Sequence, residues 1–217
     1  MSYPLTFIVD QPAKRSRLTT FLRIILAIPW LIADYVLLFL AEIVVIIAWF
    51  VLLFTGRWPQ GLYDFTVGVL RFHGRMLGYL VLLSDDFPPF SLSDDPYAIR
   101  LVADPPLAEY SRLKVLFRII YVIPAVILVY VLQIAAELSA IASWVVIVIT
   151  GKQPDGLQNT LRFCISYIIR AYGLLFLVTE TYPSFDEGGP AVAAAAPTPA
   201  PPGGPGADPL SSWKADA

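Results

Sequence analysis

The sequence predicts an all-α integral membrane protein built as a tandem duplication of one helical-hairpin unit. The first observation is that residues 16–90 reappear, without a gap, as residues 111–185. The second is that 57% of the chain is hydrophobic and its mean hydropathy is +0.68, whereas soluble domains are about 45–50% apolar. The third is that two long runs, 24–54 and 119–150, are almost free of charge. We therefore expect about four transmembrane helices, with basic interfacial helices, short β-strands outside the bilayer and a disordered C-terminal tail.

The repeat sets the domain boundaries. Identical residues recur in the same order in both halves, which shared hydrophobicity alone does not produce. The matching pairs include Arg23 and Arg118, Pro29 and Pro124, Glu42 and Glu137, Trp49 and Trp144, Arg75 and Arg170, and Pro88 and Pro183. We place the first unit at 1–92 and the second at 93–187. The remaining 188–217 are rich in Ala, Pro and Gly and contain too few large apolar residues to form a core, which favours disorder.

Each unit is expected to begin with a short strand. Residues 3–10 and 97–104 alternate between apolar and polar side chains and are rich in β-branched and aromatic residues, a pattern typical of strands. Since a lone strand is rarely stable, we expect these two to pair with each other outside the bilayer.

A basic helix and a long apolar helix should follow each strand. The run 24–54 has only Asp34 and Glu42 as charged residues, and the run 119–150 has only Glu137. Each run would form a helix of about 45 Å, longer than the roughly 20 residues that cross a bilayer and too short for two crossings. Because proline interrupts helices, we expect breaks at Pro29 and Pro124. This divides each run into an interfacial helix (14–28, 112–123) and a spanning helix (30–54, 125–149).

The interfacial helices are predicted to contact lipid head groups through their basic side chains. These residues are Arg15, Arg17, Arg23, Arg112, Lys114 and Arg118.

A tight turn should connect the two helices of each hairpin. Glycine just after a helix and proline at the start of the next are typical stop and start signals. The turn residues are Thr55, Gly56, Arg57, Pro59 and Gly61 in the first unit, and Thr150, Gly151, Lys152, Pro154 and Gly156 in the second. The helices that follow, 62–83 and 157–178, are long enough to span but contain arginines. They could instead lie in the interface, which would leave one span per unit.

Lysine and arginine are concentrated on the side of the predicted spans that carries both termini, whereas the opposite turns contain only Arg57 and Lys152. By the positive-inside rule, we expect a multi-pass protein with both termini in the cytoplasm.

Ionisable residues inside the predicted spans are the candidates for a functional site, because such groups are costly in hydrocarbon and usually pair or serve a function. Counting helical rise from each turn places acids and arginines at similar depths. We therefore predict ion pairs of Glu42 with Arg71 or Arg75, and of Glu137 with Arg170 or Arg162. These pairs would either lock the helices together or line a polar track. Asp34 is expected near the cytoplasmic interface, and His73 in contact with solvent or the interface.

The sequence contains no catalytic, metal-binding or cofactor-binding motif among those we considered. Cys164 is the single cysteine and His73 the single histidine, so we expect no disulfide and no metal site. The net charge of −2 and the short basic clusters predict no nucleic-acid partner.

Four segments of the first unit carry a resemblance to a known family: 23–29 (RIILAIP), 54–65 (FTGRWPQGLYDF), 69–79 (VLRFHGRMLGY) and 86–90 (DFPPF). Together they resemble the bacterial membrane proteins of the "domain of unknown function 4389" family, in which the unit commonly occurs as two tandem copies. The resemblance covers nearly all of 1–187. The second copy departs from the motif, with Lys152, Gln158 and Asn159 in place of Arg57, Tyr63 and Asp64. The family implies this architecture and a bacterial plasma membrane location, but no activity.

Three functions remain open at this point. The first is a non-enzymatic membrane scaffold or accessory subunit, whose partner is another membrane protein or a second copy of the chain. The second is a small oligomeric channel or carrier with a pathway along Glu42 and Glu137. The third is a hairpin protein that binds lipids or shapes the membrane through its basic helices.

Overall fold

The computed structural model describes residues 3–10 and 16–185, and for Arg17 the backbone only. The predicted tail and the predicted head-group contact of Arg15 lie outside the described residues. The elements in chain order are β1 (Leu5–Val9), α1 (Arg17–Thr55), α2 (Gln60–Leu80), β2 (Ile99–Ala103), α3 (Arg112–Leu116), α4 (Arg118–Thr150) and α5 (Asp155–Leu175).

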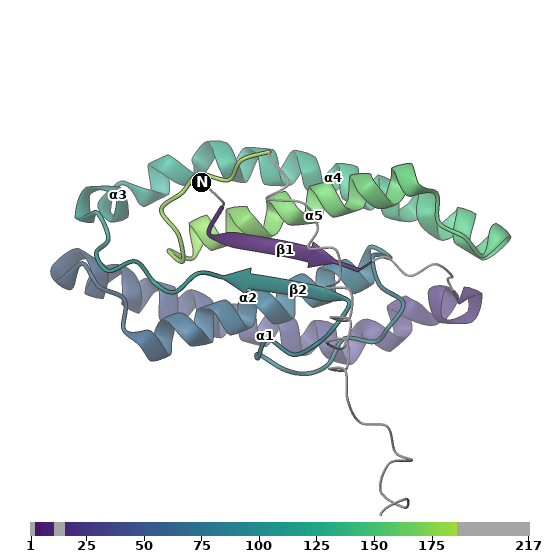
Figure 1. The fold of residues 1–217 in the computed structure, drawn as a ribbon, viewed down its shortest axis with the longest axis horizontal. Coiled ribbons are helices and arrows are strands. Elements are labelled where there is room, and N and C mark those ends of the chain that lie inside the picture. The colour runs from purple at the N-terminus through teal and green to yellow at the C-terminus, as the bar shows by residue number, and fades with distance from the viewer. Residues whose placement is uncertain (1–2, 11–15, 186–217) are drawn as a thin grey trace, which may run out of the picture.

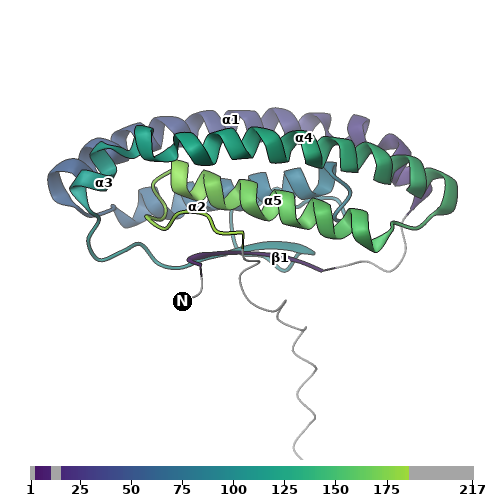
Figure 2. The same ribbon diagram turned by 90° about the horizontal axis from the view of Figure 1, so that it is seen from above.

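These elements form three layers. The long helices α1 and α4 make one outer layer, α2 and α5 lie beneath them, and β1 and β2 cover the other side of α2 and α5 (Figure 1, Figure 2). All the long elements run roughly along the same axis of the molecule. The turn between α1 and α2 lies at one end of this axis, and the turn between α4 and α5 lies at the other (Figure 1).

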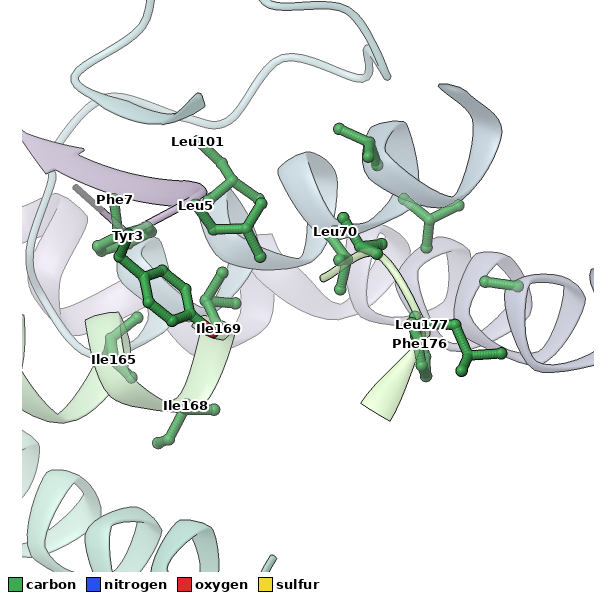
Figure 3. Packing of buried hydrophobic residues seen from close by; sticks show 14 of the residues in the cluster. Tyr3, Leu5, Phe7, Leu70, Leu101, Ile165, Ile168, Ile169, Phe176 and Leu177 are labelled. Atoms are coloured by element: carbon green, nitrogen blue, oxygen red, sulfur yellow. The ribbon is translucent and has the colours of Figure 1, made fainter. Parts of the chain in front are cut away.

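The predicted pairing of the two strands is confirmed. β1 and β2 form an antiparallel ribbon in which Phe7 lies opposite Leu101. The ribbon ties the two units together, because β1 of the first unit packs on α5 of the second, while β2 packs on α2. Figure 3 shows Leu5 and Phe7 of β1 over Ile165 and Ile169 of α5.

Glycines allow this close approach of ribbon and helices. A Cβ added to Gly78 would lie 2.3 Å from Cδ1 of Ile99, and a Cβ added to Gly173 would lie 2.0 Å from Cδ1 of Leu5. Both distances are far below van der Waals contact, so a larger residue at either position would force the buried side chain of Ile99 or Leu5 to move.

The turn signals of the sequence are confirmed, whereas the predicted breaks at proline are wrong. Gly56 (φ 70°) and Gly151 (φ 75°) end α1 and α4 in the left-handed conformation. However, α1 continues through Pro29 and α4 through Pro124. One proline removes a single backbone hydrogen bond, and each long helix packs on the helix beneath it on both sides of its proline. Ala27 and Trp30 lie in one cluster with α2 residues, and Val122 and Ala125 pack with Leu174 of α5. In the second unit the break falls before Arg118, between α3 and α4.

The helices α2 and α5 end at Leu80 and Leu175, slightly before the predicted positions. The chain reverses at Leu82 (φ 68°) and Leu177 (φ 63°), both left-handed without being glycine. Backbone bonds from Leu83 to Gly78 and from Val178 to Gly173 close these helix ends. No glycine marks these two ends, and the predicted helices extend three residues beyond each of them.

The outer layer, α1 and α4, exposes its large apolar side chains and buries mostly smaller or polar ones, the reverse of a protein surrounded by water. Where α1 and α4 face the interior, they bury mostly small or polar side chains, with Leu52, Val122 and Ile147 as the larger apolar ones. The small or polar ones include Thr20, Arg23, Asp34, Ala41, Ala48, Arg118, Ala125, Ala136 and Ser143. On the opposite face they expose large apolar side chains from Leu18 to Phe54 and from Ile119 to Ile149. By length and composition, these two helices could cross a membrane. The described part of the chain is thus mostly helical and has two candidate spans rather than four, since α2 and α5 are amphipathic and mostly buried.

Candidate functional site

Each unit buries one arginine that was predicted to contact lipid head groups, Arg23 in the first and Arg118 in the second. Arg23 is buried, and its guanidinium donates hydrogen bonds to the carbonyls of Tyr79 and Ser84 and to the carboxylate of Asp85 (2.8 Å). Arg118 does the same in the second unit, donating to the carbonyls of Leu174 and Thr179. Both arginines therefore cap the helix beneath them and do not reach lipid head groups. Burial within the outer layer explains the difference from the prediction.

Arg112 and Lys114 are exposed, and Lys114 lies 3.2 Å from Glu180. Their contact with lipid head groups stays a prediction.

The structure gives the other arginines partners that differ from the predicted acids. Arg75 donates to the carbonyls of Ser91 (3.1 Å) and Ser93 (2.7 Å), and Nε of Arg71 donates to the carbonyl of Leu101 (3.1 Å). Arg170 donates to the carbonyl of Ser184 (3.3 Å). These arginines lie on the side of α2 and α5 that meets the ribbon and the linkers. Helical rise predicted their depth along the helix but not the face on which they lie.

The acids themselves lie on the outer layer. Glu42 and Glu137 are both exposed, and Glu137 accepts a hydrogen bond from Gln133 (3.1 Å). Arg162 is half-buried on α5.

The residues of the two hairpin turns build the turns themselves. The Thr55 hydroxyl accepts from the backbone N–H of Arg57 (3.2 Å), and the Thr150 hydroxyl accepts from that of Lys152 (3.2 Å). Pro59 and Pro154 immediately precede α2 and α5, whereas Gly61 and Gly156 have open space around the position of a Cβ. The Thr-Gly-x-x-Pro motif is therefore explained by turn geometry.

The residues that sequence reasoning missed as a site are Asp34 and His73. Asp34 on α1 and His73 on α2 are each only 6% exposed, and His73 Nδ1 lies 2.9 Å from Asp34 Oδ2. The expected contact of His73 with solvent or the interface is therefore wrong, whereas the position of Asp34 near the cytoplasmic interface stays a prediction. The other polar atoms, Asp34 Oδ1 and His73 Nε2, are buried and have no hydrogen-bond partner in the described part of the chain. Such atoms are rare in folded proteins and call for a specific explanation.

Tyr172 of α5 completes the surroundings of the pair. Its ring lies edge-on to that of His73, with 5.1 Å between the centroids. Burial raises the pKa of the Tyr172 phenol, and the nearby carboxylates of Asp34 and Glu42 raise it further. The phenol therefore stays protonated at neutral pH and can donate a hydrogen bond.

Two cavities adjoin at this place. One, of about 340 Å³, is lined by His73, Leu77, Val126, Val129, Tyr130, Gln133, Ala171, Tyr172 and Leu175. The other, of about 650 Å³, is a groove between α1 and α4 whose lining is almost wholly apolar and includes Val45, Trp49, Ile119 and Ile123. Val126, Tyr130 and Leu175 line both cavities. We call the first the polar cavity and the second the apolar groove.

Comparison of the two units of the sequence contains a signal for this site, because both residues of the pair differ between them. The positions of the second unit that correspond to Asp34 and His73 hold Val129 and Ile168. Both partners of the ion pair are therefore replaced by apolar residues together, as expected for a pair that acts as one group. The opposite wall differs in the same way, since Tyr172 and Gln133 line the polar cavity and their counterparts in the first unit are Leu77 and Leu38.

This arrangement can hydrogen-bond a ligand or hold a proton. With Nδ1–H donating to Asp34, neutral His73 offers Nε2 as an acceptor, and protonated His73 offers it as a donor. Among the described residues, no three side chains of the His, Cys, Asp or Glu type come together to hold a metal ion.

Comparison with curated proteins and with solved structures gives no match to this chain. The model of the family described as "Domain of unknown function (DUF4389)" matches twice, at residues 17–91 and 112–186. These two matches correspond to the two units of the fold and together cover more than half of the chain. The chain therefore belongs to the DUF4389 family and carries two tandem copies of its domain.

Proposed function

We propose that this protein is a non-enzymatic membrane scaffold that lies flat in one leaflet, with α1 and α4 in the lipid and the ribbon in water. The observation that carries the proposal is the inverted outer layer, which buries Asp34 and Ala41 while it exposes Phe39 and Ile43. A protein surrounded by water hides its large apolar side chains, so a continuous surface of this kind indicates contact with a membrane or another protein.

The length of the apolar face favours the flat orientation. α1 has 39 residues and α4 has 33, which correspond to helices of about 58 Å and 50 Å. The hydrocarbon core is about 30 Å thick. Fitting α1 within it would need a tilt of about 60°, beyond the range of up to about 40° seen for spanning helices. Large apolar side chains are nevertheless exposed at both ends, at Leu18 and Phe54. A helix lying in the membrane plane buries all of them.

The position of the β1–β2 ribbon is a second argument that the helices lie flat in the membrane. β1 and β2 run alongside the middle of the helices (Figure 1, Figure 2), and in the described residues they form a sheet of two strands. Each strand therefore has one edge without a neighbouring strand. If the helices stood upright in the bilayer, these edges would lie at the depth of the hydrocarbon, where open sheet edges do not occur.

The scaffold role follows from the two different faces. One face would hold the protein in the membrane, while the ribbon with its open edges would remain available to partners in water. Strand addition at an open edge is a common mode of protein recognition. A channel along Glu42 and Glu137 has less support, because neither residue lines the polar cavity or the apolar groove.

Labelling from one side of the membrane tests the orientation. Single cysteines would be placed at the exposed positions Arg57, Lys152 and Asp94 in a background where the buried Cys164 is replaced by Ser. A membrane-impermeant maleimide would then be applied to oriented vesicles. We expect all three to react from the same side, and Ile32→Cys on the apolar face to react from neither. Reaction of positions 57 and 152 from opposite sides of the membrane would show that the helices span it, because the two turns lie at opposite ends of the molecule (Figure 1).

The scaffold role is tested by purification in mild detergent at native expression level, followed by native sizing. We expect a stoichiometric complex with another membrane protein or a discrete homo-oligomer. A monodisperse monomer without partners would contradict the scaffold role while leaving the orientation to the labelling test.

A further inference from the structure

We propose that the apolar groove and the polar cavity form one binding site for an uncharged lipid, whose hydroxyl or carbonyl head group hydrogen-bonds to His73. The chain of the lipid would lie in the groove between α1 and α4. This inference rests on the proposed function in one respect, since the groove opens on the face that would lie in the membrane.

The shape of the site fits an amphipathic molecule. The apolar groove has about twice the volume of the polar cavity, at about 650 Å³ against about 340 Å³. Val126, Tyr130 and Leu175 line both, so the two spaces adjoin at these three side chains. An apolar channel that leads to a smaller polar end matches a long chain with a small head group.

The polar end offers hydrogen-bonding groups that the protein does not satisfy. His73 lines the polar cavity and is buried, and its Nε2 has no partner in the described part of the chain. Asp34 fixes the ring through Nδ1 at 2.9 Å, so the free nitrogen has a defined direction. Gln133 and Tyr172 line the same space. A buried polar atom without a partner costs free energy that a ligand head group would recover.

The charge around the cavity selects against anions. Asp34 lies on one side, and Glu137 is bonded to Gln133, which lines the cavity. Glu42 is close enough to Tyr172 to affect its ionisation. Arg118 lines the groove as well, but its guanidinium is engaged by the carbonyls of Leu174 and Thr179. Fatty-acid carboxylates and phospholipid phosphates are thus disfavoured. Lipid alcohols and isoprenoid quinones share the remaining chemistry, an uncharged oxygen head on a long chain.

The test uses the full chain in detergent, so it does not depend on the orientation in the membrane. Trp49 lines the groove, and its fluorescence would be quenched by a bound decyl-substituted benzoquinone. Oleyl alcohol and oleate, which share the same chain, would then compete with the quinone. We expect saturable quenching, displacement by oleyl alcohol, and displacement by oleate that is at least about 10-fold weaker because of the surrounding carboxylates. The affinities of the quinone and the alcohol, compared with each other, show which of these two uncharged head groups the site prefers.

Two variants separate recognition of the head group from simple partitioning. Asp34→Val with His73→Ile gives the first unit the residues of the second, and it should weaken binding about 10- to 100-fold by removing the hydrogen bond. Trp144→Phe should leave the quenching intact, whereas Trp49→Phe should abolish it. If the double variant binds as tightly as the natural protein, or if oleate competes as well as oleyl alcohol, the proposal is wrong.

A third variant covers the case in which the double variant does not fold. Val126→Phe fills the place where the two cavities meet and leaves the Asp34–His73 pair intact. Loss of quinone binding in the folded Val126→Phe protein would support the site, and unchanged binding would overturn it. The labelling experiment reports separately on the membrane orientation, so failure of one proposal can be told from failure of the other.

Discussion

Replacing Arg23 by leucine tests the role of the buried arginines as helix caps. The side chain is 2% exposed, and its guanidinium binds the carbonyls of Tyr79 and Ser84 and the carboxylate of Asp85. It also lies over the Tyr79 ring, 4.3 Å from the centroid. Leucine removes every one of these interactions. Two buried carbonyls and one partly buried carboxylate would then be left without this partner.

The expected loss of stability can be worked from these groups. An unsatisfied buried polar group costs about 1–3 kcal/mol, and removal of one partner from a buried ion pair costs about 3–5 kcal/mol. The carboxylate of Asp85 is partly accessible and regains some solvation, which lowers its share. We therefore expect Arg23→Leu to reduce the free energy of unfolding by about 3–5 kcal/mol. Arg118→Leu should lose less, about 1–3 kcal/mol, because the described hydrogen bonds of Arg118 are those to the carbonyls of Leu174 and Thr179.

The assay is unfolding of the full chain in mild detergent, followed by far-ultraviolet circular dichroism. Arg57→Leu is the matched control, since it makes the same substitution at an exposed position of a turn and should change stability by less than about 0.5 kcal/mol. If Arg23→Leu unfolds like this control, the carbonyls of α2 do not depend on Arg23. That result would favour the prediction from the sequence that Arg23 contacts lipid head groups.

Two further predictions concern the ribbon and its surroundings. Gly78→Val and Gly173→Val should each destabilise the protein by about 1–3 kcal/mol and speed proteolysis within 91–104, because their side chains would occupy the places of Ile99 and Leu5. Gly61→Val has open space around it, so equal proteolysis of all three variants would contradict the packing argument. Burial raises the pKa of Tyr110 to about 12, above the value of about 10 in an unfolded chain. The stability linked to this phenol is thus complete below pH of about 10 and is lost as the pH rises towards 12, by roughly 2 kcal/mol. Burial also raises the pKa of Tyr3, Tyr63 and Tyr97, so absorbance at alkaline pH should show several late-titrating tyrosines and one fewer in Tyr110→Phe. Loss of a tyrosine that titrates near pH of about 10 in this variant would refute the assignment.

The parts of the fold that follow from local chemistry could be predicted from the sequence. The left-handed glycines at 56 and 151 and the prolines at 59 and 154 mark the turns, because these residue types have distinctive backbone preferences. The alternating segments predicted the ribbon, and the repeat predicted a similar arrangement of long helices in both units.

The errors concern information that a one-dimensional pattern does not contain. Helical rise places Glu42 and Arg75 at similar depths, but it does not state which side of α2 faces α1. Arg75 lies on the opposite side and binds the linker after α2. Similarly, Pro29 suggested a break, yet its effect depends on whether the helix beneath continues to support α1. Both questions are decided by packing between layers, which composition and periodicity do not specify.

Comparison of the two units distinguishes contacts that occur in both of them from contacts that occur in one. Trp49 Nε1 donates to the carbonyl of Val115 (2.8 Å), and Trp144 Nε1 donates to the carbonyl of Thr20 (3.2 Å). These are corresponding positions of the two units, so the same contact joins the units twice. The contacts of Arg23 and Arg118 also occur twice, each within its own unit. Contacts made twice in this way are explained by the need to hold the layers together. The Asp34–His73 pair is made once, beneath a cavity, and its second-unit counterparts form no such pair because Val129 and Ile168 are apolar. A pair needed for stability would be needed equally in both units, so its presence in one of them argues that it serves the cavity.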